Sequence, residues 1–262
     1  MDRKEYWNKD YVEYWKKTTA DAEDKSSERS TVKKISGKDF KAPDIEVITS
    51  FLSQIPFMKD FMILDYGCGY GRLYDWLSDK GIYYGIDISQ AMIDECIKNH
   101  PENKDRFIVA EGESLPFEDG KFDVVVCNGV FDACYQESAL SEMLRVTKGG
   151  HYIMFSGKND LYYDDDEEAY IAEVNARKKG HPNYFTDVRC MLNQLSGVSK
   201  VVSERYALRR GDYSKNLFEH TISDTFYEWI LIIQKNDVIE VNTKFEKFSD
   251  LYSKTYRAKV GL

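Results

Sequence analysis

The middle of the chain alternates between short apolar runs and amphipathic segments. The apolar runs have the length of strands and are continuous rather than alternating, which is typical of strands buried on both faces; they lie at 61–66, 82–87, 106–112, 121–129 and 151–156. Amphipathic stretches of helical period follow the first, second and fourth runs. Strand and helix alternation of this kind predicts a parallel sheet with helices on both of its faces.

The segments that flank this region have other patterns. Residues 2–17 carry aromatic side chains at helical spacing, which predicts a short amphipathic helix, and the polar stretch 20–39 reads as a loop or linker. Pro43 opens a further amphipathic helix that runs to Ile55. After Gly157 the rhythm breaks, and residues 158–187 resemble an insertion with one helix flanked by loops.

The last third of the chain returns to regular elements. A helix is expected over 185–197, strands over 198–208 and 225–235, and a weakly amphipathic helical tail over 237–262. The two strands give the sheet further members beyond the fifth.

Composition narrows the classes of partner. The 262 residues carry a formal net charge of −9, so attraction to a nucleic-acid backbone or to an anionic membrane is not expected to supply binding energy. A small-molecule partner is therefore preferred, with no nucleic acid and no membrane. The five cysteines are scattered and form no CxxC pair, so neither a metal site nor thiol redox chemistry is predicted. No apolar run approaches the length of a signal core or a membrane span, which favours the cytoplasm. The oligomeric state stays open.

A glycine-rich turn follows the first predicted strand in the sequence ILDYGCGYGRL. The strand ends at Asp65, and the glycines from Gly67 to Gly71 let a ligand approach the backbone beside the start of a helix. The spacing is GxGxG, whereas a dinucleotide-binding loop requires GxGxxG and a P-loop ends in GKS or GKT.

Polar residues end the neighbouring strands as well. Asp87 closes the second strand, where its carboxylate can accept hydrogen bonds from two ribose hydroxyls; Glu111 follows the third strand, and Asn128 with Gly129 follows the fourth. Ligands of open α/β sheets bind outside the carboxyl ends of the strands. This set of residues predicts a cofactor that contains adenosine.

Four segments in order resemble the motifs of class I S-adenosylmethionine-dependent methyltransferases of the type 11/25 kind: DYGCGYG, GIDIS, AEGESLPFEDGKFDVVVCNGV and LRVTKGGHYIMF, spanning about 61–157. The resemblance implies a Rossmann-like, doubly wound sheet of seven strands with the last one antiparallel. It also implies methyltransferase activity with S-adenosyl-L-methionine as cofactor and S-adenosyl-L-homocysteine as product. The expected organisation is an N-terminal helical extension over 1–58, the cofactor-binding domain over 59–236 with an acceptor-pocket insertion at 158–187, and the tail.

The resemblance also assigns site residues. Asp65 and the backbone of Gly67, Cys68 and Gly69 would hold the methionine end of the cofactor, and Asp87 the ribose. The remaining cofactor positions are Ile88 and Met92 against the adenine ring, Glu111, Gly112 and Glu113 near its polar edge, and Asn128 and Val130 on the methyl-donor side. Many members of the family have Asp where this chain has Glu111, which puts the detail of adenine recognition in question. The segment CNGVFDACY lacks the Asn-Pro-Pro-Tyr pattern of enzymes that methylate nucleobase amines.

Methyl transfer to a hydroxyl group calls for a general base. His181, in the insertion, is the preferred candidate, with Asp132 and His220 as alternatives, whereas His100 and His151 are expected to be structural. The expected reaction is O-methylation of a small polar acceptor such as a sugar, a nucleotide sugar or a surface-glycan precursor. A protein or RNA methyltransferase and a catalytically silent cofactor-binding regulatory subunit are the alternatives, and an amine or phosphate acceptor would require no base.

Two further features have a functional and a structural interpretation. The N-terminal aromatic residues Tyr6, Trp7, Tyr11 and Trp15 form either a lid over the cofactor or a stripe that packs on the sheet. The acidic run 164–168 is interpreted as a solvated helix start, and Cys68 and Cys127 as small packing residues.

Overall fold

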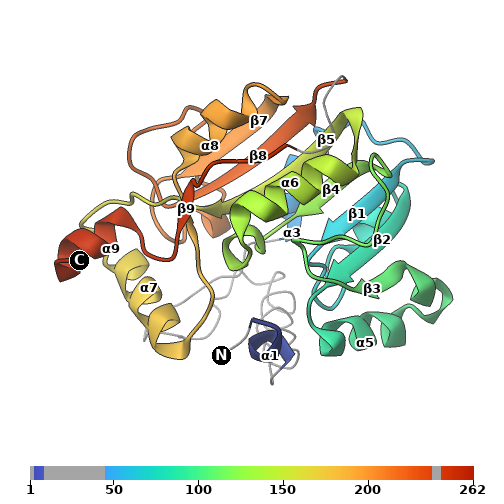
Figure 1. Ribbon diagram of the computed structural model, residues 1–262, viewed down its shortest axis with the longest axis horizontal. Coiled ribbons are helices and arrows are strands. Elements are labelled where there is room, and N and C mark those ends of the chain that lie inside the picture. The colour runs from blue at the N-terminus through green and yellow to red at the C-terminus, as the bar shows by residue number, and fades with distance from the viewer. Residues whose placement is uncertain (1–2, 9–44, 238–242) are drawn as a thin grey trace.

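The computed structural model describes residues 3–8, 45–237 and 243–262. A seven-stranded sheet in the order β3-β2-β1-β4-β5-β8-β7 forms its centre (Figure 1). The strands are β1 (Met62–Tyr66), β2 (Ile82–Asp87), β3 (Phe107–Val109), β4 (Phe122–Cys127), β5 (Thr147–Lys158), β7 (Ser199–Ala207) and β8 (Glu228–Lys235). Neighbours from β3 to β5 pair in parallel, and β8 is antiparallel to both β5 and β7. This is the predicted doubly wound sheet with its last strand antiparallel.

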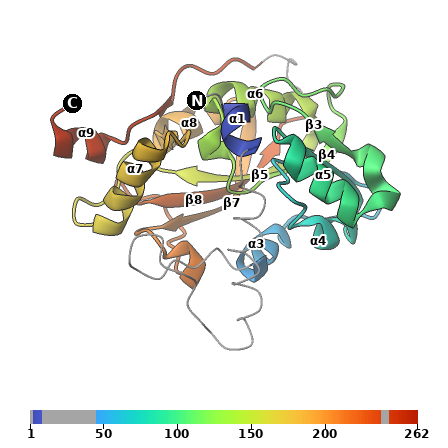
Figure 2. The same cartoon turned by 90° about the horizontal axis from the view of Figure 1, so that it is seen from below.

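Helices cover both faces of the sheet (Figure 2). They are α1 (Arg3–Asn8), α3 (Ile45–Leu52), α4 (Tyr74–Ser78), α5 (Gln90–Asn99), α6 (Gln136–Val146), α7 (Glu167–Lys179), α8 (Val188–Leu195) and α9 (Lys254–Val260). Side chains of α3, α4 and α5 share one core with one face of the sheet, and those of α6 and α8 share another core with the opposite face.

Strand periodicity explains the two cores. Successive residues of a strand point to opposite faces; accordingly Ile63 and Val124 pack with Phe51 of α3, whereas Leu64 and Val125 pack on the α6 side. All six residues of β4 are buried, as expected for a central strand covered on both faces.

The glycine turn is longer than the sequence pattern suggests. A helix was expected directly after Gly71, but α4 begins only at Tyr74, because Gly67, Gly69 and Gly71 all have positive φ values, which are incompatible with a right-handed helix. The third strand is shorter than expected. The fifth continues through Gly157 to Lys158 and so reaches two residues further toward the carboxyl edge of the sheet.

The chain beyond β5 contains one element that the sequence did not predict. The expected helix of the insertion is α7, but the following β6 (Phe185–Thr186) pairs antiparallel with β9 (Ser249–Asp250) of the tail. The expected helical tail is thus wrong for most of its described length. Of residues 243–262 only Lys254–Val260 is helical, starting where the Ser253 side chain accepts a hydrogen bond from the Tyr256 amide. The predicted linker 20–39, Pro43 and the aromatic residues Tyr11 and Trp15 lie outside the described residues.

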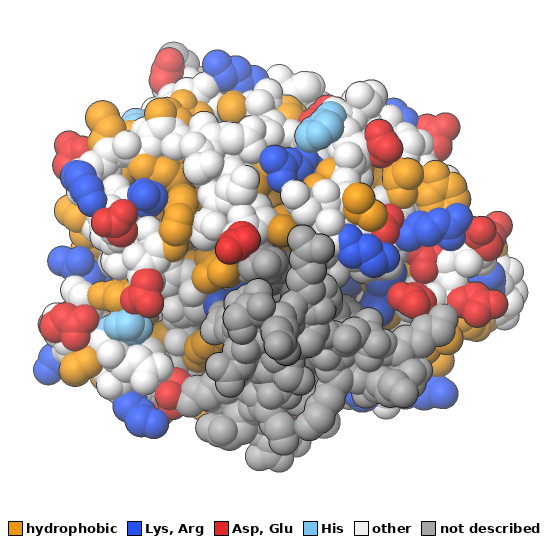
Figure 3. Space-filling model, turned by 180° about the vertical axis from the view of Figure 1, so that it is seen from behind, with side chains coloured by type: hydrophobic (Ala, Val, Ile, Leu, Met, Phe, Trp, Pro, Cys, Tyr) orange, Lys and Arg blue, Asp and Glu red, His pale blue; other side chains and the backbone are white. Residues whose placement is uncertain are grey.

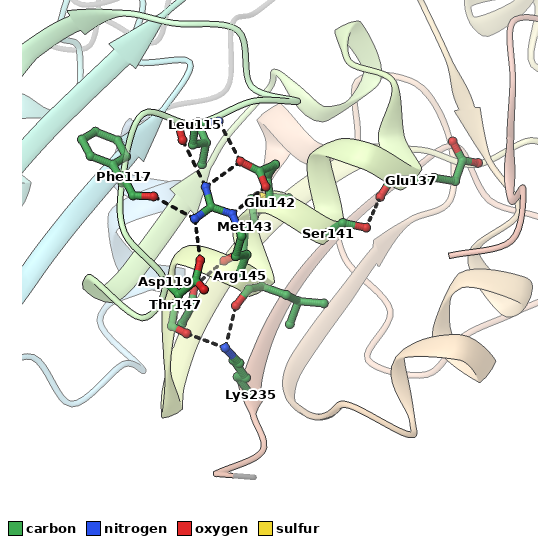
Figure 4. Close-up of polar contacts among 11 residues, drawn as sticks. Leu115, Phe117, Asp119, Glu137, Ser141, Glu142, Met143, Arg145, Thr147 and Lys235 are labelled. Atoms are coloured by element: carbon green, nitrogen blue, oxygen red, sulfur yellow. Dashed lines mark hydrogen bonds and ion pairs between the residues drawn. The ribbon is translucent and has the colours of Figure 1, made fainter. Parts of the chain in front are cut away.

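A cluster around Arg145 fixes the segment between β3 and β4 onto α6 (Figure 4). The Arg145 guanidinium donates to the carbonyls of Leu115 and Phe117 and to the carboxylates of Asp119 and Glu142, over 2.7–3.1 Å. Glu142 in turn accepts from the Leu115 amide at 2.7 Å. The stretch that carries Glu111 and Glu113 therefore leads into a firmly held loop.

Candidate cofactor and acceptor site

The loop after β1 exposes its backbone at the carboxyl edge of the sheet. A Cβ atom at Gly67, where φ is +74°, would lie 2.5 Å from Val130, so the loop packs directly against the segment after β4. Gly69 and Gly129 also have positive φ, and a Cβ at either would meet no atom within 4 Å among the described residues. Among the described residues, the backbone of these two glycines is therefore uncovered at the carboxyl edge.

Asp87, the last residue of β2, faces this loop. Its two carboxylate oxygens accept hydrogen bonds from the backbone amides of Gly69 and Ser89, both at 2.9 Å. Burial raises the pKa of Asp87, and these amides offset part of that effect. A carboxylate offers about four lone-pair directions, so the group retains capacity for ligand hydroxyls.

Asp65, the last residue but one of β1, is almost completely buried, with 3% of its surface exposed. The Tyr83 hydroxyl donates to its Oδ2 at 2.9 Å. Burial raises the pKa of Asp65 to about 7, and the charge of Asp87 adds to the rise although the Tyr83 hydrogen bond opposes it. Two acidic groups at one edge, only partly compensated, favour a ligand that brings a positive charge.

The other predicted cofactor residues differ in how far they are buried. Cys68 and Met92 are buried, Ile88, Gly112, Asn128 and Val130 are half-buried, and Glu111 is exposed. The site of Gly112 admits no side chain, because a Cβ there would collide with the ring of Tyr66. The Glu113 carboxylate accepts from the Tyr135 amide at 2.8 Å and pairs with Arg3.

Helix α1 lies between α5 and α7 at this edge (Figures 1 and 2). Arg3 forms a 2.6 Å ion pair with Glu113 and lies 4.2 Å from the centre of the Tyr135 ring. At the other end of the helix, the Ser89 hydroxyl donates to the Trp7 carbonyl at 3.0 Å. These contacts fix α1 at the carboxyl edge, and the lid interpretation stays a prediction.

His181 packs against α1. Its ring makes edge contacts with Tyr6 and Trp7, with centroid distances of 5.1 and 5.2 Å. Burial lowers the pKa of His181 to about 4; the positive charge of Lys158 contributes, and the negative charge of Asp132 opposes the shift. The imidazole is therefore neutral at pH 7, able to accept a proton but weak as a base.

Lys158, at the end of β5, is a site residue that the sequence analysis missed. Its ammonium group donates to the carboxylate of Asp132, in the segment after β4, and to Asn183 Oδ1 at 2.7 Å. Burial alone would lower the pKa of Lys158, but the charge and hydrogen bond of Asp132, together with Tyr227 and Glu228, outweigh it and the pKa is raised. The signal was available in the sequence, since a strand that runs through Gly157 places the next residue at the carboxyl edge.

Glu228 is the second missed residue. It is the first residue of β8 and lies directly opposite Lys158 in the antiparallel pair. Burial raises the pKa of Glu228 to about 7, although Lys158 and Arg210 oppose the rise. This carboxyl group changes charge near neutral pH, which is a property of acid–base groups.

The remaining histidines lie elsewhere. His100 stacks on Tyr74 at 3.7 Å, His151 lies 3.5 Å from Asp123 near the opposite edge of the sheet, and His220 is exposed. In the acidic run, Asp166 caps α7 by accepting from the Ala169 amide, and Asp165 pairs with Arg209. The described residues contain no group of His, Cys, Asp and Glu that could hold a metal ion.

The sheet order, the glycine turn and the acid-ended strands define a cofactor-binding domain of the methyltransferase kind. Residues 64–155 match the family described as methyltransferase domain. The 18S rRNA (guanine-N(7))-methyltransferase of Bos taurus is 30% identical over 175 residues, which are 57% of this chain and 59% of that protein. The phthiotriol/phenolphthiotriol dimycocerosates methyltransferase of Mycobacterium tuberculosis H37Rv is 32% identical over 119 residues, 44% of this chain and 43% of that one.

Solved structures agree on the fold. An S-adenosylmethionine-dependent methyltransferase from Mesorhizobium loti superposes with a TM-score of 0.56 at 15% identity, covering 72% of this chain and 96% of that one. Residues 64–155 thus match a methyltransferase domain, and the chain shares the fold of S-adenosylmethionine-dependent methyltransferases. It spans only about half the length of the curated relatives it matches. No helix within the described ranges is long and apolar enough to cross a membrane.

Proposed function

We propose that the protein binds S-adenosylmethionine at the carboxyl edge of the sheet and transfers its methyl group to an oxygen of a small polar acceptor. The observation that carries the proposal is the Asp87 carboxylate bonded to the Gly69 amide, with buried Asp65 beside it. The residues present suit the cofactor, because ribose hydroxyls need acceptors, the cofactor carries positive charge, and no described atom lies within 4 Å of a Cβ built at Gly69 or Gly129.

The chain's own residues have mainly to bind, orient and exclude water. When bound, the cofactor supplies an activated methyl group on a sulfonium. Asp65 and Asp87 hold the cofactor, and Val130 and Gly129 lie where strand β4 ends beside the glycine turn. Helix α1 covers the edge through Arg3, which reduces access of water to the reacting atoms. Lys158, Asp132 and His181 face the acceptor.

Calorimetry with Asp87→Ala tests the cofactor site. The wild-type chain is expected to bind S-adenosylmethionine and S-adenosylhomocysteine, and Asp87→Ala to lose about ten- to a hundredfold in affinity, about 1.4–2.8 kcal/mol, because two hydrogen bonds to a charged acceptor are removed. Asp94→Ala, an exposed carboxylate on α5, is the matched control and keeps wild-type affinity. Absence of binding to the wild-type chain would reject the proposal.

RNA methylation is a second candidate, supported by the relative named for 18S rRNA. The formal charge of −9 speaks against it, and the face in Figure 3 shows acidic and basic side chains interspersed. Methyl-release assays with structured RNA and with a panel of small hydroxyl compounds, at 50 and 200 mM salt, separate the two. We expect turnover only with the small compounds; RNA methylation that weakens steeply with salt would favour the alternative.

A further inference from the structure

The ammonium group of Lys158 has a donor to spare. A lysine has three N–H donors, and Lys158 uses two of them, on Asp132 and Asn183. None of the other described residues accepts the third. The side chain is 21% exposed, so part of it reaches the surface of the site.

Two cations act on the neighbouring imidazole. The charges of Lys158 and Arg177 lower the pKa of His181 and that of Asp132 raises it, and the charge of Glu173 acts on Arg177. Arg177 donates to the Asn183 carbonyl, and its buried Nε has no partner among the described residues. On the far side of Lys158, Glu228 has a pKa near 7 and so supplies only part of a negative charge near neutrality.

We propose, on the basis of the function proposed above, that Lys158 contacts the acceptor oxygen directly and that the acceptor is an acidic hydroxyl compound, a phenol or an enol, which reacts as its anion. An anionic oxygen would accept the spare donor of Lys158 in a charge-assisted hydrogen bond. The half-buried rings of Trp7 and His181 offer an aromatic wall for a planar acceptor. A sugar alcohol ionises far less readily and would need a stronger base than His181, whose pKa is about 4.

The group transfer balances without any further reactant. The acceptor loses its proton to water, and Lys158 stays protonated beside the resulting oxyanion. The oxygen lone pair then forms the new bond to the methyl carbon, and the carbon–sulfur bond breaks with its electron pair remaining on sulfur. Anion and sulfonium thus give a neutral methyl ether and a neutral thioether, which leaves Asp132 as the counter-ion of Lys158.

A chromogenic phenol tests the contact without requiring turnover. The wild-type chain saturated with S-adenosylhomocysteine is titrated with 4-nitrophenol, whose phenol and phenolate forms absorb at different wavelengths. We expect binding that lowers the pKa of the probe by about one unit or more, which corresponds to at least tenfold tighter binding of the phenolate. Lys158→Met abolishes this shift, and Lys158→Arg retains most of it.

Two controls keep the test decisive. Lys148→Met removes a lysine of the same strand that pairs with Asp123 at 2.7 Å, near His151 at the opposite edge, and leaves the shift unchanged. Lys158→Met alone leaves the Asp132 charge buried without its partner and could prevent folding. The double variant Lys158→Met with Asp132→Asn removes both charges and so provides a folded chain for the same test. A wild-type chain that binds S-adenosylhomocysteine but not the probe, or a shift that survives Lys158→Met, overturns the inference. Failure to bind S-adenosylhomocysteine rejects the proposed function instead.

Discussion

The buried carboxyl group of Asp65 lowers the stability of the folded chain when it is ionised, although the same charge favours a cationic ligand. Its pKa rises from an ordinary 3.8 to about 7 in the folded chain, chiefly through burial. Between those values the folded state binds more protons than the unfolded state, so the group's contribution to stability is full below about pH 4 and is lost as the pH rises to 7. At about 1.4 kcal/mol per unit of pKa, the ionised group costs up to about 4 kcal/mol at pH 8.

Asp65→Asn should therefore stabilise the ligand-free protein at pH 8 and weaken cofactor binding at the same pH. Denaturant unfolding at pH 5 and pH 8 measures the first effect, which we expect to be larger at pH 8. Calorimetry with S-adenosylhomocysteine measures the second. Equal effects on stability at both pH values would show that Asp65 is not protonated near neutrality.

Two acidic residues of the candidate site, Asp65 and Asp87, could be picked out from the sequence, whereas Lys158 could not. Asp65 and Asp87 end strands beside a glycine turn, and strand ends are visible in the hydrophobic pattern. Lys158 follows Gly157, which the hydrophobic pattern places just after the end of a strand. Glu228 is the first residue of β8, and its position opposite Lys158 is known only from the pairing of β8 with β5. Antiparallel pairing across more than 60 residues of chain leaves no local signal.

At the scale of elements, α1 contacts both the predicted cofactor residues and the insertion that carries His181. Its contacts run from Ser89, at the start of α5, through Glu113 to the ring of His181. The Arg3–Glu113 pair is only partly exposed, with 17% and 13% of the two side chains accessible. A pair so placed holds the helix more firmly than a fully exposed pair would.

Arg3→Ala should accordingly release α1 and speed the dissociation of bound S-adenosylhomocysteine by about five- to tenfold, equivalent to about 1 kcal/mol. Stopped-flow displacement of the bound product measures this rate. Lys4→Ala, an exposed neighbour on the same helix, is the control and is expected to have no effect. An unchanged rate in Arg3→Ala would mean that α1 only packs on the surface, as in the alternative interpretation of the aromatic stripe.

Element boundaries were less predictable than the elements themselves. The central strands were found because Val124, Val125 and their neighbours are apolar on both faces. The two-residue pair of β6 with β9 was missed because it depends on backbone hydrogen bonds and on Glu137, which accepts from the amides of Phe248 and Ser249. So short an element leaves no hydrophobic period to detect.

On the scale of the whole molecule, the C-terminal segment is tied to the insertion that carries His181. Glu173 of α7 is 1% exposed and accepts hydrogen bonds from the Tyr162 hydroxyl at 3.1 Å, from the Ser253 amide at 3.0 Å and from the Ser253 hydroxyl at 2.6 Å. Thr255 of α9 likewise exchanges hydrogen bonds with the backbone of Tyr162. Insertion, tail and sheet should therefore unfold together.

Glu173→Ala removes three hydrogen bonds to a buried acceptor and is expected to lower the free energy of unfolding by about 3 kcal/mol while leaving a single transition. Far-ultraviolet circular dichroism and tryptophan fluorescence follow the transition independently, and their midpoints should fall together. Glu167→Ala, an exposed position in the first turn of α7, serves as the control and is expected to change stability by less than about 0.5 kcal/mol. If a separate early transition appears, the tail and insertion form an independent unit, and the loop that carries His181 is held by local contacts and not by the fold as a whole.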